Sequence, residues 1–466
     1  MNFNSWQFVL FLLVVLGLAA PLRRYSIGYK WLLLLASYYF YGSWNWQYLG
    51  LILFSTGFDY WIAPRFAGSA HPRRLIAFSV AVNLGVLGFF KYADFLLTSL
   101  ATGLTTVGLD VHFGAFDLLL PVGISFYTFQ SMSYTIDVYR QQLAPRRSLL
   151  DYALFVAFFP QLVAGPIVRA VEFFREIDHP RKIGLARFNE ALVLIAFGYV
   201  KKVVFADSLA QAFDPYWLAP SQADPWVMLL AVYAFALQIY FDFSGYTDIA
   251  IGVALLFGFR FPRNFNYPYA AASVRDFWRR WHMTLSRWLR DYLYIALGGN
   301  RRGPWRTRIN LMLTMLLGGL WHGASFNFVI WGALHGGYLV GERILLASVS
   351  GYRAPRPLRW LGALITFHLV CFAWIFFRAP DLATSLGVIE RIASIHIAGL
   401  NWSALRPGAL AVLGLYGLHL LGARSGYKRR LVLAPLPVHA LALTAAMLLL
   451  IWFAPEQSAP FLYFQF

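Results

Sequence analysis

Long apolar runs separated by short basic blocks occupy most of this 466-residue chain. Hydrophobic residues make up 59% of the sequence and charged residues 13%, about half the charged share of an average water-soluble domain. Several runs are shorter than the ~20 residues that a helix needs to cross a bilayer core. The runs cover residues 6–22, 31–41, 48–64, 75–90, 118–138, 149–168, 191–205, 226–239, 309–320, 326–346, 358–377, 410–421 and 431–453. The sequence therefore predicts an all-α polytopic membrane protein with roughly 11 to 13 membrane helices, including short, tilted or re-entrant segments, around a central cavity or tunnel.

The formal net charge of the chain is +18. The basic residues lie in short blocks, such as Arg23-Arg24 and Arg73-Arg74, between the apolar runs. This distribution follows the positive-inside rule of membrane proteins. We therefore expect the protein to interact with a lipid bilayer and not with nucleic acid. The single cysteine, Cys371, excludes a disulfide within the chain and a thiolate zinc site. Without an evident repeat or low-complexity linker, residues 1–466 are expected to form a single integral membrane domain.

One histidine, His322, lies deep in the apolar sequence 311–335. An ionisable side chain near the membrane midplane costs roughly 2.5 kcal/mol or more, so His322 is by default a functional-site hypothesis. A polar group or irregular backbone at that depth is tolerated where protein buries it or a water-filled cavity receives it. The pattern predicts that His322 lines an internal cavity, with Trp321 and Asn327 close to it in the chain.

Glycines on both sides of His322 favour a local break or close helix packing. Gly318 and Gly319 precede the histidine, and Gly323 follows it. A helix that begins near Ile309 would reach His322 after about 20 Å. We therefore expect this helix to end inside the membrane.

Two aspartates and a second histidine also lie at membrane depth. Asp242 and Asp248 need hydrogen-bond donors such as Arg, Tyr or Ser, whether they support a catalytic wall or bond between helices. His335 follows His322 by 13 residues, or about 220° around an ideal helix, so the two side chains need not face each other. A helix-packing hydrogen bond is the favoured interpretation of His335. Alternatively, both aspartates and both histidines (His322 and His335) form the proton relay of a secondary transporter.

The longest break in the apolar pattern, residues 261–308, is rich in arginine and tryptophan. Tryptophan and leucine recur at helical spacing over residues 275–294 and predict a basic amphipathic helix at the cytoplasmic interface. Its arginines would meet either lipid phosphates, with the tryptophans in the aromatic belt, or the phosphates of an anionic substrate. His282 and Ser286 are four residues apart on one helix face, but without a third ligand they predict no metal site.

A series of short motifs runs in order through about residues 91–340. The motifs include Lys91-Tyr-Ala, Pro121-Val-Gly-Ile-Ser-Phe-Tyr-Thr-Phe129, Phe159-Pro-Gln-Leu-Val-Ala-Gly-Pro166, Tyr240-Phe-Asp-Phe-Ser-Gly-Tyr246, Asn264-Phe-Asn266, Phe277-Trp-Arg-Arg-Trp-His282 and Gly319-Leu-Trp-His-Gly323. Together they resemble the membrane-bound O-acyltransferase family, in particular its bacterial alginate O-acetyltransferase-like branch. The resemblance implies that a family-like core, covering about residues 91–340, lies within the membrane domain.

This resemblance implies an O-acetyltransferase in which His322 corresponds to the essential intramembrane histidine of the family. His282 corresponds to a second characteristic histidine. The imidazole of His322 would act as a general base toward an acceptor hydroxyl that attacks a thioester. Acetyl-CoA or another acyl thioester is the expected donor substrate, with no bound cofactor. It would enter from the cytoplasm, where Arg279, Arg280 and Arg290 would attract its phosphates.

The same resemblance implies a multi-pass protein of the bacterial inner membrane. Its expected partner is a periplasmic acetyltransferase or acceptor protein of a polysaccharide-modification system. An exopolysaccharide such as alginate or cellulose is the expected final acceptor, and peptidoglycan is the alternative. Trp321, Asn327, Ser286 and Asp242 are expected to support the site or line its tunnel. Two other functional classes stay open: a proton-coupled secondary transporter, which would move solute without consuming thioester, and a structural subunit of an export complex.

Overall fold

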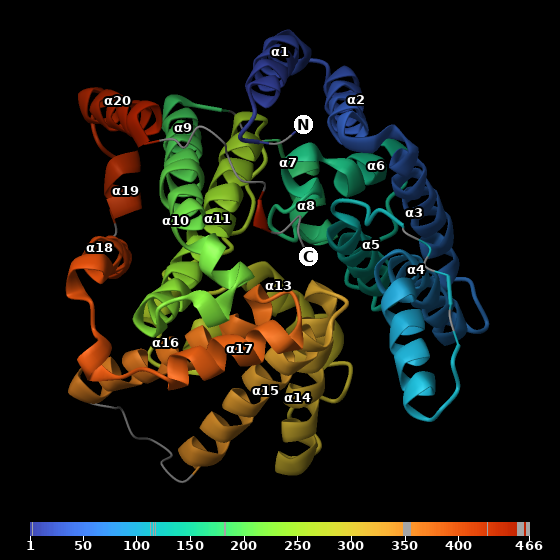
Figure 1. The fold of residues 1–466 in the computed structure, drawn as a ribbon. Coiled ribbons are helices and arrows are strands. Elements are labelled where there is room, and N and C mark those ends of the chain that lie inside the picture. The colour runs from blue at the N-terminus through green and yellow to red at the C-terminus, as the bar shows by residue number, and fades with distance from the viewer. Residues whose placement is uncertain are drawn as a thin grey trace. The chain divides into compact units, whose positions relative to one another are not determined.

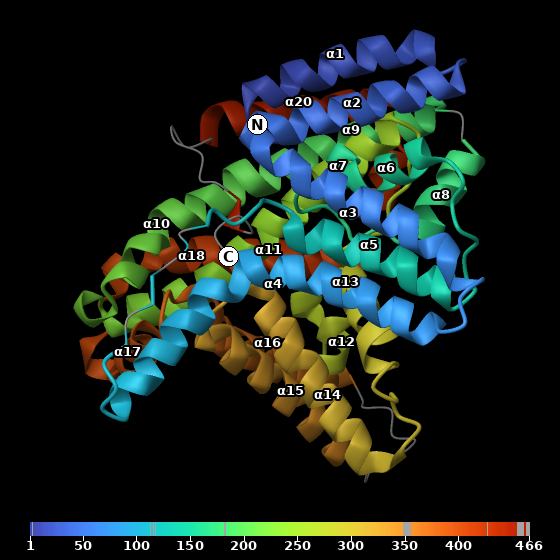
Figure 2. The ribbon, with the colours of Figure 1, turned by 90° about the vertical axis from the view of Figure 1, so that its right-hand side faces the viewer.

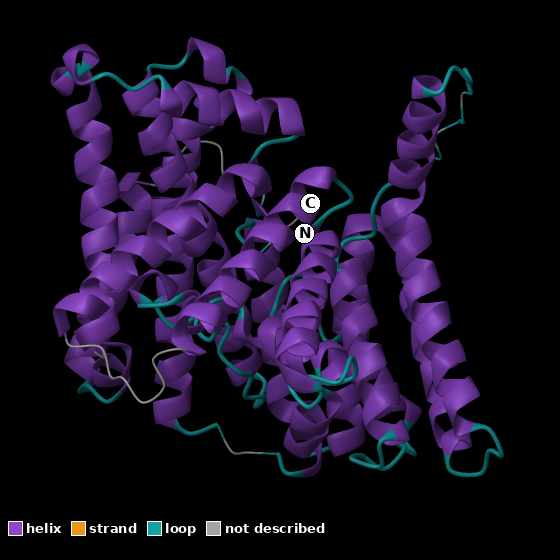
Figure 3. Ribbon diagram, turned by 90° about the horizontal axis from the view of Figure 1, so that it is seen from below, coloured by secondary structure: helices purple, strands orange, loops and turns teal. Residues whose placement is uncertain are grey.

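The computed structural model describes the chain except residues 2, 112, 115, 117, 181–182, 348–355, 426, 454–460 and 463–466. Every regular element in this described part is a helix, and no strand occurs there, as Figure 3 shows. Elements labelled η are short 3-10 helices, except η3 and η6, which are π-helical. The predicted all-α fold is therefore confirmed.

Two compact units divide the chain, whose elements are labelled in Figure 1. The first comprises Met1–Ala191 and Ala250–Pro262, and the second comprises Leu192–Ile249 and Arg263–Phe466. The long helix α11 (Pro225–Leu256) contributes most of its length to the second unit and its last turns to the first.

Aromatic packing and bonds to buried carboxylates hold the first unit together. Its elements are α1 (Trp6–Leu22), α2 (Ser26–Asn45), η1 (Trp46–Tyr48), α3 (Leu49–Ile62), η2 (Ala63–Phe66), α4 (Pro72–Thr106), α5 (Ile124–Tyr139), α6 (Leu149–Ala157), α7 (Phe159–Leu162) and α8 (Ala170–Asp178). Helices α1 and α2 lie side by side (Figure 2). The ring of Phe159 packs against those of Phe11 and Phe40, with centroids 5.2 and 5.7 Å apart. Lys30 Nζ pairs with the buried Asp151 carboxylate at 2.8 Å.

The second unit contains both candidate histidines. After α9 (Leu185–Tyr199), which is shared with the first unit, its elements are η3 (Val200–Ala206), α10 (Asp207–Leu218), η4 (Pro220–Gln222), most of α11, η5 (Pro268–Ala270), α12 (Val274–Trp278), α13 (Met283–Trp288), η6 (Leu289–Tyr294), α14 (Gly303–His322), α15 (Phe326–Ala347), α16 (Arg356–Arg378), α17 (Leu382–Ala393), η7 (Ile397–Gly399), α18 (Trp402–Ser425), α19 (Tyr427–Val432) and α20 (Leu436–Phe453). Helices α14 and α15 form a hairpin and lie side by side in Figures 1 and 2. The largest fully buried side chains of this unit include Trp217, Trp331 and Trp374.

Five helices in the described part are long and apolar enough to cross a membrane. They are Pro72–Thr106, Pro225–Leu256, Pro357–Arg378, Trp402–Ser425 and Leu436–Phe453, and the shorter apolar helix α1 adds to them. Large apolar side chains on the last of these helices stay exposed on the protein, such as Leu441 at 71% and Ile451 at 70%. Such surfaces suit contact with lipid tails. The chain is therefore a multi-pass membrane protein.

The amphipathic helix predicted over residues 275–294 is broken into α12, α13 and η6. His282, between α12 and α13, has a φ of 39°, a left-handed conformation that interrupts the helix. Trp281 and Trp288 are only 3% and 5% exposed. The prediction of one continuous helix with these tryptophans in an aromatic belt is wrong, because the tertiary fold buries both rings inside the second unit.

A lysine shared by two aspartates connects η3, α10, α11 and the C-terminal segment. Lys202 Nζ lies 2.7 Å from Asp207 Oδ1 and 2.7 Å from Asp242 Oδ1. The backbone N–H of Leu462 donates to Asp242 Oδ2 at 3.1 Å. Lys202, Asp207 and Asp242 are at most 3% exposed, so this ion cluster is fully enclosed by protein.

The second aspartate of α11 has a lysine partner as well. Lys201 Nζ lies 2.5 Å from Asp248 Oδ2. The π-helical turn η3 carries both lysines, and π-helical turns are frequent at functional or strained positions. Lysine, rather than the expected Arg, Tyr or Ser, is therefore the principal donor to both carboxylates. The adjacent pair Lys201-Lys202 within an apolar run was the sequence signal for this arrangement.

Replacing Lys202 with methionine should destabilise the second unit, because Asp207 and Asp242 would lose their shared cation in a buried place. Removing one member of a buried ion cluster costs about 3–5 kcal/mol. Thermal unfolding of the purified variant in detergent measures the loss. The triple variant K202M/D207N/D242N removes the three charges together and should recover most of the stability. An unfolding midpoint of Lys202→Met equal to that of the wild type would contradict this account.

Candidate active site

Helix α14 ends at His322 because Gly323 leaves the helical conformation, with φ −163° and ψ 156°. Helix α15 begins at Phe326, after three intervening residues, where Ser325 Oγ accepts a hydrogen bond from the Asn327 amide at 3.2 Å. The predicted break after the histidine is confirmed, and it places His322 at the tip of the hairpin. The helix begins at Gly303 rather than near Ile309, so it is about 30 Å long instead of the expected 20 Å.

Glycines allow α14 and α15 to approach closely. A Cβ atom at Gly319 would overlap the carbonyl oxygen of Phe328, and one at Gly332 would lie 2.5 Å from the carbonyl oxygen of Met315. Larger residues at these two positions would force the helices apart, which is the usual role of small residues between membrane helices. The close packing predicted at Gly319 is confirmed, and it holds His322 in a fixed position against α15.

Aromatic rings surround the His322 imidazole. Its centroid lies 5.0 Å from that of Trp321, 5.1 Å from that of Trp331 and 5.2 Å from that of Phe377, each in an edge-to-face arrangement. These rings come from α14, α15 and α16, and the histidine is 6% exposed. A reaction at this imidazole would therefore meet little competing water.

The second candidate histidine, His282, is fully buried directly before α13. Its Nδ1 lies 3.3 Å from Asn264 Oδ1. The same oxygen accepts hydrogen bonds from the Thr284 amide at 3.2 Å and from Thr284 Oγ1 at 2.7 Å. One asparagine side chain therefore holds both the imidazole and the backbone that follows it.

These hydrogen bonds determine which nitrogen of His282 carries hydrogen. A backbone amide only donates, so Asn264 Oδ1 is an acceptor and His282 Nδ1 must be the donor. In the neutral ring Nε2 then carries the lone pair. Burial lowers the pKa of His282, which lies outside the five long apolar helices, to about 3. The ring is therefore neutral at physiological pH and held in one tautomer.

The indole of Trp321 lies between the two histidines. Its centroid is 6.2 Å from that of His282 and 5.0 Å from that of His322. Phe243 of α11 packs against His282 with centroids 4.8 Å apart. The structure thus brings His322, His282 and Trp321 into one cluster, and adds Asn264 as a residue whose role the sequence did not indicate.

Asn327 connects the start of α15 to the end of α16. Its Nδ2 donates to the carbonyl oxygen of Ala379 at 3.0 Å. Ala379 follows α16, which carries Phe377 against the His322 ring. Asn327 is 1% exposed, and its Oδ1 has no hydrogen-bond partner among the residues that the structure describes.

Ser286 stabilises the turn that presents His282. Its hydroxyl donates to the carbonyl oxygen of Trp281 at 3.2 Å, and its amide donates to the carbonyl oxygen of His282 at 3.0 Å. His282 is the N-cap residue of α13 in a left-handed conformation. The expectation that His282 and Ser286 share a helix face is therefore wrong.

Asp242 and His335 have different neighbours: Asp242 is bonded to polar groups, and His335 is packed among aromatic rings. Asp242 bonds to Lys202 and to the Leu462 amide, as described above. His335 is fully buried, and neither of its ring nitrogens has a hydrogen-bond partner in the described part of the chain. Its ring instead packs against Trp331 at 4.7 Å and Trp278 at 5.1 Å between centroids. The expected helix-packing hydrogen bond of His335 is wrong, because aromatic rings fill the space around the imidazole.

The three candidate arginines do not share one environment. Arg279 and Arg290 are exposed, and Arg290 Nε pairs with Asp291 Oδ1 at 2.6 Å. Arg280 is partly buried, and its Nε lies 2.9 Å from Asp276 Oδ1. Arg280 also lines a pocket with two arginines from later helices.

Comparison with known proteins decides the family. Residues 141–379, which include both candidate histidines, match the family model described as the membrane-bound O-acyltransferase family. The chain belongs to the membrane-bound O-acyltransferase family. As a member, it is an O-acyltransferase that is embedded in a lipid bilayer.

Relatives of this acyltransferase include proteins that match its whole length. It is 41% identical to a probable alginate O-acetylase of Azotobacter vinelandii over the full length of both chains. It is 44% identical to a probable alginate O-acetylase of Pseudomonas aeruginosa, over 92% of this chain and 83% of that one. A peptidoglycan O-acetyltransferase of Helicobacter pylori is 40% identical, over 78% of this chain and 73% of its own.

Replacing Asn264 with leucine should destabilise this acyltransferase by about 3 kcal/mol, because three buried donors on His282 and Thr284 lose their common acceptor. Thr284→Val removes a single donor and serves as the matched control, with an expected loss of about 1 kcal/mol. Thermal unfolding in detergent compares the two variants. Equal midpoints for the two variants would show that Asn264 Oδ1 does not hold this turn.

Proposed function

We propose that this acyltransferase carries acetyl groups from a cytoplasmic thioester, acetyl-CoA or a related donor, across the bacterial inner membrane for O-acetylation of an exopolysaccharide of the alginate type. The observation that carries this proposal is the likeness, over the full length of the chain, to the probable alginate O-acetylase of Azotobacter vinelandii. Peptidoglycan is the second candidate polymer, because the relative from Helicobacter pylori is nearly as similar.

In this proposal His322 is the general base. The hydroxyl oxygen of the acceptor attacks the thioester carbonyl carbon, and a ring nitrogen of His322 takes the hydroxyl proton. When the tetrahedral intermediate collapses, the carbon–sulfur bond breaks and the imidazolium returns the proton to sulfur, which leaves as a thiol. The new carbon–oxygen bond replaces the carbon–sulfur bond, and the enzyme is unchanged. A general base in such a role typically increases the rate by about 10²–10⁴-fold.

The neighbouring residues then act by positioning the base. His282, neutral and fixed by Asn264, supports the indole of Trp321, which packs edge-to-face on His322. Asn327 supports Phe377, a second ring on His322, by holding the end of α16. Ser286 and Asp242 serve more remotely, through the turn before α13 and through the buried ion cluster.

Donor and acceptor would reach His322 from opposite sides of the membrane. The exposed guanidinium groups of Arg279 and Arg290 suit the phosphates of a coenzyme thioester on the cytoplasmic side. A periplasmic acetyltransferase or acceptor protein would take the acetyl group on the other side and complete its transfer to the polymer. Membership of the acyltransferase family favours this reaction over proton-coupled transport.

Replacing His322 with alanine should lower thiol release from acetyl-CoA by about 10²–10⁴-fold, because the proton acceptor is lost. The measurement uses full-length protein in lipid discs with a candidate acceptor protein. His368→Ala is the matched control, since His368 is exposed on α16 and its Nδ1 bonds the Leu364 carbonyl oxygen of its own helix. Thiol release at the wild-type rate by folded His322→Ala would remove the base from the mechanism. Solute flux without thiol release would favour transport.

The variants Arg279→Gln and Arg290→Gln should each raise the KM for acetyl-CoA about two- to fivefold and leave kcat unchanged, because exposed charges contribute weakly to binding. Steady-state rates over a range of donor concentrations separate the two constants. Arg306→Gln, an exposed arginine on α14, is the control. A fall in kcat at constant KM would place these arginines outside donor binding.

A further inference from the structure

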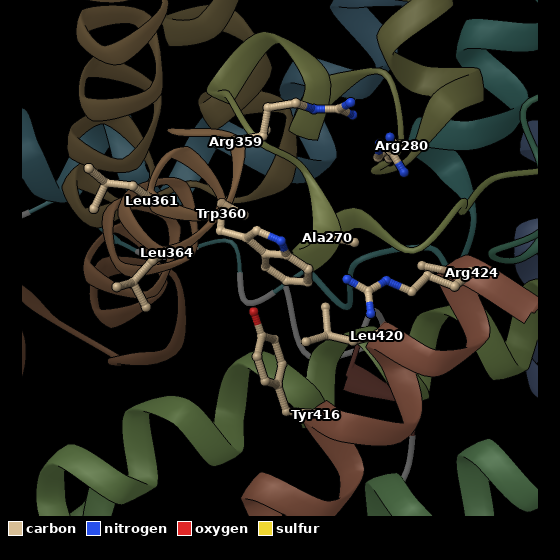
Figure 4. Close-up of a pocket in the computed structure, with 12 residues that line it drawn as sticks. Ala270, Arg280, Arg359, Trp360, Leu361, Leu364, Tyr416, Leu420 and Arg424 are labelled. Carbon is tan, nitrogen blue, oxygen red and sulfur yellow. The ribbon is translucent and has the colours of Figure 1, made fainter. Parts of the chain in front are cut away.

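A pocket of about 1040 Å³ opens in the second unit between α16, α18 and the loop around η5 (Figure 4). Its lining includes Leu361 and Leu364 near the start of α16. Phe377, which contacts His322, lies near the other end of the same helix. The 16 residues from Leu361 to Phe377 correspond to about 24 Å along a helix. The part of the pocket on α16 is therefore distant from the His322 ring.

Three arginines supply the polar part of the pocket. Arg280, Arg359 and Arg424 line it, and the lining contains no carboxylate among the described residues. Figure 4 shows the three guanidinium groups on one side of the pocket near Trp360, and the Arg424 guanidinium carbon lies 4.5 Å from the centroid of the Trp360 ring. Arg280 has a carboxylate partner in Asp276. No carboxylate in the described part of the chain is bonded to Arg359 or Arg424.

Leucines supply the apolar part, on a surface that the protein leaves exposed. Leu361 and Leu364 of α16 are 50% and 55% exposed on the protein. Leu420 of α18 lines the same pocket, and its neighbour Leu421 is 62% exposed. Both helices are long and apolar enough to cross the membrane. The leucines therefore continue from the arginines along the two helices toward the apolar core of the bilayer.

The position of the arginines matches the level of lipid phosphates. Arg359 lies near the first residue of α16 and Arg424 near the last residue of α18. Ends of membrane-spanning helices lie in the interfacial region, and basic pockets between such helices bind anionic head groups. Guanidinium groups bind phosphate oxygens through paired hydrogen bonds. The site thus combines a phosphate-binding end with an apolar wall, which suits the binding of an amphiphile.

We propose that this pocket binds an anionic phospholipid. Its phosphate would lie among Arg280, Arg359 and Arg424, and an acyl chain would run along Leu361, Leu364 and Leu420. A coenzyme thioester also carries phosphates, but its arm is polar, whereas the exposed side of this pocket is lined with leucines. The wall open to the bilayer therefore favours the lipid over the donor. Bound lipid would hold the start of α16 to the end of α18.

The test is a titration of the purified full-length protein in detergent with phosphatidylglycerol and with phosphatidylcholine, with bound lipid counted by native mass spectrometry. We expect the wild type to prefer phosphatidylglycerol. Arg359→Gln and Arg424→Gln should each weaken its binding about fivefold, and the double variant about thirtyfold, since each basic residue at a membrane surface contributes similarly. Arg306→Gln is the matched control and should bind like the wild type. Acetyl-CoA in excess should not displace the lipid.

Three results would overturn the proposal: equal binding of the two lipids, unchanged binding by Arg359→Gln and Arg424→Gln, or displacement of phosphatidylglycerol by acetyl-CoA. The last result would assign the pocket to the donor. Arg359→Gln breaks no ion pair in the described part of the chain, so it keeps the test valid if the double variant does not fold. Thiol release measured on the same samples separates a failure of lipid binding from a failure of acyl transfer.

Discussion

Backbone hydrogen bonding in the irregular segment between α11 and α14 is the constraint on which the site depends. Backbone amides that are buried outside helices must find partners within the protein, because an unpaired buried amide costs about as much as a lost hydrogen bond. Here the amide of Asn266 donates to the carbonyl oxygen of Arg280 at 2.9 Å. The amide of Met283 donates to the carbonyl oxygen of Asn264, also at 2.9 Å. The Asn264 side chain adds its bonds to His282 and to the following turn. These bonds close the segment on itself and allow a left-handed histidine to be buried in an otherwise helical unit.

The two histidines are held by different means. His322 ends a helix whose glycines pack against α15, so its position follows from close helix packing. His282 depends on one asparagine oxygen and has its tautomer set by that oxygen. The Trp321 ring packs edge-to-face against both imidazoles. In the proposed mechanism, aromatic rings around His322 suit acyl transfer from a thioester, because they exclude water that would hydrolyse the donor.

Sequence patterns predicted the features that depend on local chemistry. The apolar runs indicated a polytopic helical protein, and the glycines around His322 indicated the break and the close packing. Features that depend on tertiary contacts were not predictable in the same way. The interruption at His282 requires a positive φ in a residue other than glycine, which only its surroundings stabilise. Asn264 lies in a loop without periodicity, so nothing local indicates its role. Lys202, the partner of Asp242, was visible as one of two lysines within an apolar run, but nothing local indicated which carboxylate it would pair with.

The proposed reaction and the proposed lipid site occupy separate places on the protein. The reaction requires the thioester at the end of α14, and the arginine pocket of α16 and α18 is left for an anionic lipid. The most direct measurement is a cryo-EM structure of the full-length protein in lipid discs with a non-hydrolysable acetyl-CoA analogue. The account predicts the acyl carbonyl carbon close to the His322 ring, with room for an acceptor oxygen about 3–3.5 Å from that carbon. An analogue whose acyl group lies in the pocket beside Arg359 and Arg424, away from His322, would contradict it.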